Sequence, residues 1–317
     1  MQTVWLVMLG LMLTGWSVLD GANLGLGMSL RRPGRSERER RLLLTALGPF
    51  LLAGEVWLVA GAGLLIGVFP AFEKDLLAAC YPIVVALVVS WVLRDAGVWL
   101  RSRRPGRRWR RGWERTVAVA SGGFAFAWGV LLASVAQGVP LDGGVGLGTL
   151  IGPYSLLWGA AMVAVFTLHG AAFTAMRMPR EQRGGAVRAA RRCGPLAAGL
   201  LLAGGVAVPV FGIDLLRPVP AALILVVAVT AAVAGPRLLE HGRDGRAFAV
   251  TAVAAAAPLL AVGSAMAPLL THGTAGPDTL ALLARVTLPV VPLLLAAQAW
   301  LWWTFRHRVG RGSAVFF

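Results

Sequence analysis

The chain has 317 residues, of which 57% are hydrophobic and only 14% charged, whereas a soluble domain carries about a quarter charged residues. This composition excludes an ordinary soluble domain and indicates an integral membrane protein. The formal net charge of +16 comes from 29 arginines and one lysine, which cluster between apolar runs, so we expect them to orient the chain in the membrane and to meet anionic lipid rather than nucleic acid.

Nine apolar segments are each long enough to cross a bilayer, which takes about 20 residues. The first starts near the N-terminus without a preceding basic region or a following cleavage site, so we expect a retained helix rather than a signal peptide. Their boundaries are least marked at the turn 214–220 and within the eighth segment. In chain order the segments cover residues 3–27, 42–69, 77–99, 116–138, 150–176, 194–214, 218–236, 247–270 and 279–304.

The connections between these segments alternate in charge. By the positive-inside rule, this alternation predicts on which side of the membrane each connection lies. The alternate connections and the tail hold 26 of the 30 basic residues, so we expect them in the cytoplasm, with the N-terminus outside. The sequence thus predicts an all-α integral membrane protein with one polytopic transmembrane domain over residues 1–317. The basic stretches are 31–41, 101–115, 177–192, 237–246 and 306–312.

A few polar side chains lie inside the apolar segments, where a charge costs at least ~2.5–3.5 kcal/mol on insertion scales. Asp20 lies in the first segment with Asn23 one helical turn later, and Glu55 lies near the middle of the second. Asp20 and Glu55 are therefore candidates for a proton path. Asp20 has two other interpretations: a counter-charge to a neighbouring subunit, or a carboxylate that pairs with Arg94 or with the backbone at the membrane edge.

Other intramembrane side chains favour structural roles. Arg94 and the adjacent Asp95 are expected to form a charge pair at the inner interface, and His169 is expected to be packed or hydrogen-bonded. The two cysteines form no CxxC or CxxCH motif, and no histidine lies three or four residues from another histidine or a cysteine. We therefore expect neither a disulfide nor a metal or haem site within this chain.

Several stretches in order resemble one family, subunit II of cytochrome bd quinol oxidase. The stretch "LDGANLGLGM" (19–28) is similar to the signature of its first helix, and "GEVWLV" (54–59) lies in a segment similar to its second. The similarity covers residues 1–176, and beyond them only the hydropathy pattern agrees. The similar stretches are 19–28, 47–70, 91–101, 111–142 and 153–173.

This resemblance implies a fold, a complex and a location. The family folds as two four-helix bundles plus a peripheral helix in the bacterial inner membrane. Subunit II pairs with a subunit I that holds haem b, haem d and the quinol site, and the complex oxidises quinol and reduces dioxygen to water. The chain itself would hold no haem and would not be catalytic alone. It would scaffold subunit I, bind lipid or quinone, and offer a route for protons or oxygen.

The resemblance also assigns roles to single residues. Asp20, Glu55 and Trp57 match acids and a tryptophan of the family, whereas Asn23 and Leu52 stand where the family has proton-path acids. Protons would then use Asp20, Glu55 and Asn23, or the chain is a divergent paralogue without that path. The same resemblance makes three residues candidate contacts to the partner subunit, quinone or lipid: Trp57, Arg94 and His169.

Two other classes of function remain open on the sequence. A small polytopic permease or channel could use Asp20 and Glu55 to bind substrate or protons, although we see no clear internal repeat of the kind such proteins carry. A structural membrane protein without oxidase function is the third class, because Asn23 and Leu52 replace acids.

Overall fold

The computed structural model describes residues 2–32, 35–138 and 150–310, so the basic stretches at 33–34 and 311–312 and the end of the stretch 111–142 lie outside the described residues. Within the described ranges the chain is all-helical, and nine helices are long and apolar enough to cross a membrane. The nine predicted segments are thereby confirmed. The helices are α1 (Gln2–Ser29), α2 (Glu37–Val68), α3 (Pro70–Leu100), α4 (Arg107–Ala136), α6 (Pro153–Arg177), α7 (Arg183–Val210), α8 (Pro218–Glu240), α9 (Asp244–Ala265) and α11 (Pro277–Thr304), with the short α10 (Ala267–Thr271) and the 3-10 turns η1 (Arg101–Arg103) and η2 (Arg180–Gln182).

Several helices begin earlier than the apolar segments do, because the basic connections are themselves partly helical. At the start of α2, the Ser36 hydroxyl accepts a hydrogen bond from the Glu39 amide, and the Glu39 carboxylate accepts one from the Ser36 amide, both at 3.2 Å. This capping box satisfies two backbone donors that would otherwise lack partners. The helix can therefore start within the arginine-rich stretch rather than at the membrane edge.

The eighth predicted segment differs from the structure in one respect. Residues 247–270 are divided between α9 and α10, because Met266 leaves the helical conformation with φ −104° and ψ 13°. Pro268 follows at the start of α10, where a residue without an amide hydrogen is tolerated. After the break, α10 contacts α1 and α3 as well as α9.

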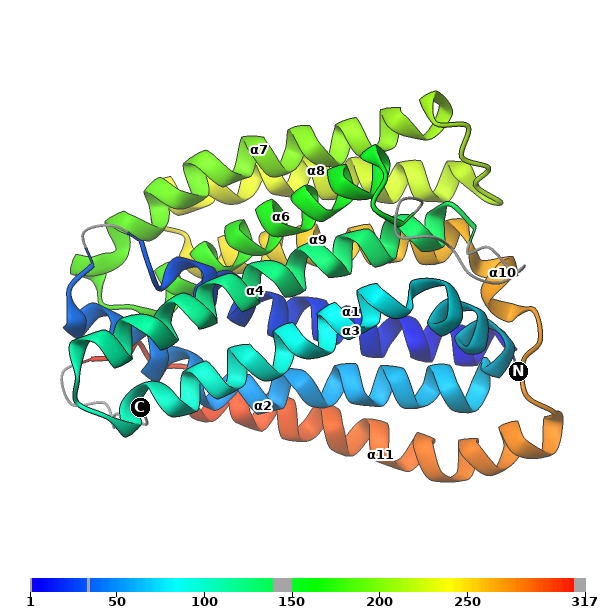
Figure 1. The fold of residues 1–317 in the computed structure, drawn as a ribbon, viewed down its shortest axis with the longest axis horizontal. Helices are drawn as coiled ribbons and strands as arrows, with labels where there is room; N and C mark the ends of the chain where they lie inside the picture. Colours follow the sequence, from blue (N-terminus) through cyan, green and yellow to red (C-terminus); the bar gives the residue numbers. More distant parts are fainter. Residues whose placement is uncertain (1, 33–34, 139–149, 311–317) are drawn as a thin grey trace.

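The spanning helices form two groups of four with one helix outside them. Helices α1 to α4 contact one another in a closed ring, and α6 to α9 form a second ring that meets the first through α1, α4 and α6. Helix α11 lies along α2 outside both rings (Figure 1), and only 6% of its apolar window is buried. The predicted architecture of two four-helix bundles plus a peripheral helix is confirmed.

The two ends of the molecule differ in charge. The α1–α2, α3–α4 and α6–α7 connections lie at the same end as the end of α11, and the start of α1 lies at the opposite end (Figure 1). These three connections are the richest in arginine. We refer below to the end that carries them as the basic end.

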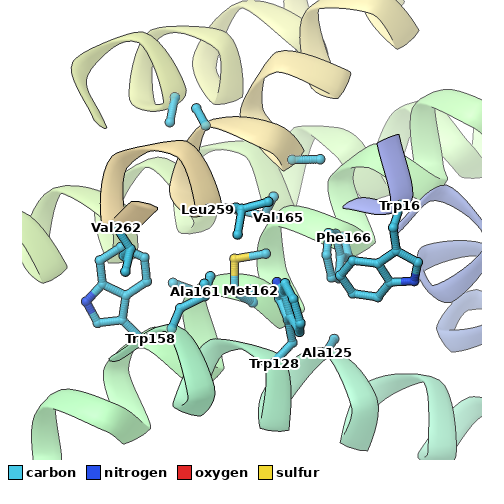
Figure 2. Packing of buried hydrophobic residues seen from close by; sticks show 14 of the residues in the cluster. Trp16, Ala125, Trp128, Trp158, Ala161, Met162, Val165, Phe166, Leu259 and Val262 are labelled. Atoms are coloured by element: carbon cyan, nitrogen blue, oxygen red, sulfur yellow. The ribbon is translucent and has the colours of Figure 1, made fainter. Parts of the chain in front are cut away.

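The core between the two bundles is aromatic and apolar (Figure 2). Trp16 of α1 packs on Trp128 of α4, with ring centroids 4.4 Å apart, and on Phe166 of α6 at 6.1 Å in an edge-on arrangement. Leu259 and Val262 of α9 close the same cluster. Tilted and edge-on ring pairs add stabilisation beyond the apolar area they bury.

Helices α1 and α6 cross where two glycines meet, and this crossing supports a first prediction. A Cβ atom on Gly25 would lie 1.8 Å from the carbonyl oxygen of Phe166, and one on Gly170 would lie 2.3 Å from the carbonyl carbon of Gly25. Because these neighbours are backbone atoms, they cannot move aside. Gly25→Ala should therefore lower the free energy of unfolding by about 3 kcal/mol, as overpacking does in a dense core.

The matched control for this prediction is Gly10→Ala on the same helix, where an added Cβ would meet nothing within 4 Å. Alanine favours a helix over glycine, so this variant should unfold at the wild-type temperature or slightly above it. Thermal unfolding of the two purified variants in detergent compares them directly. Equal unfolding temperatures would show that α1 and α6 do not cross at Gly25.

Candidate functional site

One arginine lies at the centre of a buried charged cluster where α1, α2 and α3 meet. The side chain of Arg94 is 1% exposed, and its Nη1 atom donates to both carboxylate oxygens of Asp20 at 2.7 and 2.8 Å. Its Nη2 atom donates to Glu55 Oε1, and its Nε atom donates to Asp95 Oδ1 at 2.9 Å. We call Asp20, Glu55, Arg94 and Asp95 the Arg94 cluster.

The geometry bears on one of the interpretations of Asp20 that were made from the sequence. Its predicted pairing with Arg94 is confirmed, as is the pairing of Arg94 with Asp95. The sequence did not place Glu55 with them. The signal that could have suggested it is chemical: a lone arginine in an apolar segment needs carboxylate partners, and few acids are available at that depth.

Asp20 is held by neutral donors as well as by the guanidinium. Trp16 Nε1 donates to its Oδ2 atom at 3.3 Å, and Asn23 Nδ2 donates to its Oδ1 atom at 3.2 Å and to the carbonyl oxygen of Phe50 at 3.0 Å. An ionised acid at position 23 could not donate either bond. Asparagine at this position therefore fixes the Asp20 carboxylate and ties α1 to α2.

The charges of the Arg94 cluster do not balance. Three carboxyl groups surround one guanidinium, and within the described residues no other basic side chain forms an ion pair with them. Uncompensated charge in a low-dielectric interior is expensive, and the usual escape is to neutralise a group. The excess negative charge would therefore be balanced by a proton on one carboxyl group or by a cation supplied by another chain.

The two remaining candidate residues, Trp57 and His169, are buried within this chain. Trp57 is 3% exposed and donates through Nε1 to Gln298 Oε1 of α11 at 3.4 Å. His169 is hydrogen-bonded and packed, as predicted: Nε2 lies 2.9 Å from the Val18 carbonyl oxygen, Nδ1 lies 2.9 Å from Thr251 Oγ1, and the ring stacks on Phe248. Contacts of Trp57, Arg94 or His169 with a partner, quinone or lipid stay predictions.

A second buried ion-pair network, which was not predicted from the sequence, lies at the basic end. Arg101, 1% exposed, donates through Nε and Nη2 to Glu114 Oε1 at 3.1 and 2.7 Å, and through Nη2 to Glu37 at 2.8 Å. The sequence did contain an indication of this network, because Glu114 is an acid inside an otherwise basic run. This network joins the starts of α2 and α4 to the end of α3.

Comparison with known proteins places this geometry in a family. The model of the family described as cytochrome bd terminal oxidase subunit II matches residues 1–305. The chain belongs to this family. The match extends well beyond residue 176, where the resemblance read from the sequence became one of hydropathy alone.

Individual relatives and a solved structure agree with the family. The cytochrome bd ubiquinol oxidase subunit 2 of Bacillus subtilis (strain 168) is 24% identical, with 98% of this chain and 97% of that protein covered. The bd-I subunit 2 of Escherichia coli (strain K12) is 28% identical over 57% of this chain and 50% of its own length. The bd oxidase of Geobacillus thermodenitrificans has the same fold, with a TM-score of 0.76 at 18% identity over 96% of this chain and 98% of that one.

Membership of this family carries several consequences. As a cytochrome bd oxidase subunit II, the chain is a multi-span subunit of a bacterial respiratory membrane complex and has a partner, subunit I. The complex contains haem. In the described part of this chain, no group of three histidine, cysteine or acidic side chains is arranged to hold a metal ion.

Proposed function

We propose that this chain scaffolds the haem-bearing subunit I of a quinol:dioxygen oxidoreductase, and that its Arg94 cluster carries protons toward that subunit. The observation behind the second part is the meeting of three carboxyl groups at one buried guanidinium. Haem b and haem d would lie in subunit I, and quinol would be the substrate of the complex. The names of the relatives support the assignment to a quinol oxidase complex, and the unbalanced carboxyl groups described above support the proton path.

Side-chain exposure supports a direction for the proton path. The Asp95 side chain is 23% exposed, that of Glu55 is 9% exposed and that of Asp20 is 2% exposed, and each contacts a different nitrogen of Arg94. A proton taken up at Asp95 would pass directly to Glu55, whose side chain interacts with that of Asp95, while the guanidinium of Arg94 stays charged beside them. With the basic end in the cytoplasm and the N-terminus outside, Asp95 lies closest to the side that supplies protons.

The departures at positions 23 and 52 have separate explanations under this proposal. Asn23 positions Asp20 through its donated hydrogen bond instead of carrying a proton. Leu52 is 58% exposed on the surface of α2, whereas Leu51 is 1% exposed, so position 52 faces away from the Arg94 cluster. Protons would therefore move inside the bundle through Asp95, Glu55 and Asp20.

Co-purification tests the assignment as an oxidase subunit. The affinity-tagged chain, extracted from its native membrane in mild detergent, should bring a second membrane chain together with haem b and haem d absorption bands and quinol-dependent oxygen uptake. A colourless chain that purifies alone would contradict the proposal and favour a permease. A coloured complex without oxygen uptake would favour a structural paralogue.

A further inference from the structure

Four arginines gather at one corner of the basic end, where the α1–α2 connection meets the start of α7. Arg32 Nη1 donates to the Gly185 carbonyl oxygen at 2.9 Å, which brings the connection onto α7. Burial lowers the pKa of Arg32; the nearby Cys193 acts in the opposite direction, and the charges of Arg192 and Arg188 lower it further. Burial and the charge of Arg32 likewise lower the pKa of Arg35, to about 10. We call Arg32, Arg35, Arg188 and Arg192 the arginine corner.

The arginine corner differs from the two arginine groups at this end that surround a buried carboxylate, Glu114 or Asp244. Glu114 and Glu37 pair with Arg101, and Asp244 pairs with Arg183 at 2.7 Å and with Arg308 at 2.6 Å. Across residues 2–32, 35–138 and 150–310, no carboxylate forms an ion pair with any member of the arginine corner. Glu39 acts on Arg35 only at longer range, and its carboxylate caps α2.

Like charges held together in this way favour an anion beside them. Arg32 uses one of its five N–H donors on Gly185, so the others are available to a group with several acceptor oxygens. Guanidinium groups bind phosphate with charge-assisted, often paired hydrogen bonds. Phosphate chemistry therefore matches the arginine corner better than a single carboxylate does.

The adjoining surface of α7 indicates the source of that phosphate. Arg188, Arg192 and Leu196 follow one another at intervals of four residues, so they share one face of the helix. Both arginines are exposed, and Leu196 is 55% exposed one turn farther along the apolar part of α7. This face presents charge at the membrane edge and apolar surface beside it, as a headgroup and its acyl chains require.

We propose that the arginine corner binds the phosphate group of an anionic phospholipid, with the acyl chains along α7. This site is separate from the Arg94 cluster and does not depend on the proton path. The test uses the protein purified with its partner subunit, stripped of lipid with detergent and titrated with phosphatidylglycerol in native mass spectrometry. Phosphatidylcholine and inorganic phosphate serve as the comparison ligands.

The decisive variant is R188Q/R192Q, because both side chains are exposed and their loss should leave folding intact. The matched control is R107Q/R108Q, which removes two exposed arginines from the start of α4. We expect the affinity for phosphatidylglycerol to fall at least about tenfold in R188Q/R192Q and in Arg32→Gln, because charge-assisted hydrogen bonds are lost, and to stay unchanged in R107Q/R108Q.

Three results would overturn this proposal. Equal losses in R188Q/R192Q and R107Q/R108Q would mean that only general surface charge attracts the lipid. Unchanged affinity in R188Q/R192Q would mean that phosphatidylglycerol binds elsewhere. Binding of phosphatidylcholine or of inorganic phosphate as tight as that of phosphatidylglycerol, and lost in the same variants, would assign the arginine corner to a zwitterionic headgroup or to a free anion.

Discussion

Replacement of Arg94 by glutamine should lower the free energy of unfolding by about 3–5 kcal/mol, the usual consequence of removing one partner from a buried ion pair. The variant would leave Asp20, Glu55 and Asp95 together without the guanidinium that contacts all three. Thermal unfolding in detergent and the amount of protein recovered from membranes measure this loss. We expect the variant to unfold at a much lower temperature and to accumulate poorly.

Two further variants separate the Arg94 cluster from a general effect of lost charge. Arg191→Gln removes an arginine that is 74% exposed and pairs with Glu240 at the surface, so it should change stability by less than about 1 kcal/mol. Adding Asp20→Asn to Arg94→Gln removes one stranded carboxylate and should recover part of the loss. If Arg94→Gln proves as stable as Arg191→Gln, the guanidinium does not hold the three helices together.

Replacement of Glu55 by glutamine should lower quinol-dependent oxygen uptake at least about tenfold while haem content and assembly stay at the wild-type level. The glutamine oxygen can still accept the hydrogen bond that Arg94 donates to Glu55, so the packing of α2 on α3 is kept. The amide cannot release a proton, so the relay would be interrupted. Oxygen-electrode rates per haem, with subunit ratios from gels, separate turnover from assembly.

The matched control for Glu55→Gln is Glu240→Gln, the same chemical change on an exposed carboxylate. It should leave oxygen uptake and haem content unaltered. Wild-type turnover in Glu55→Gln with normal haem content would remove Glu55 from the proton path. A parallel loss of turnover and haem would show that Glu55 acts in assembly instead.

Much of the fold could be predicted because hydropathy and charge both repeat along the chain. Each span is a long apolar run, and a missed helix would have inverted every later connection, so the arginine pattern checked the count. The end of α9 was not predictable in the same way. Met266 lies inside an apolar run, and the helix breaks there so that the short α10 contacts α1 and α3 as well as α9.

The Arg94 cluster was predictable only in part. Asp20 and Arg94 lie at similar depth in their helices, so their pairing could be proposed from depth alone. The face of α2 that points toward α3 could not be predicted, because α2 is apolar on all sides and its sequence does not fix its rotation about the helix axis. The contact of Glu55 with Arg94 was therefore not predicted from the sequence. The contact of His169 with Thr251 on α9 was not predicted either.

Infrared difference spectroscopy of the reduced and oxidised complex tests the central claim most directly, because it detects the C=O stretch of a protonated carboxyl group. We predict a carboxyl signal that changes with redox state, shifts in heavy water and disappears in Glu55→Gln but not in Glu240→Gln. A spectrum that is the same in Glu55→Gln and in the wild-type complex would contradict the account.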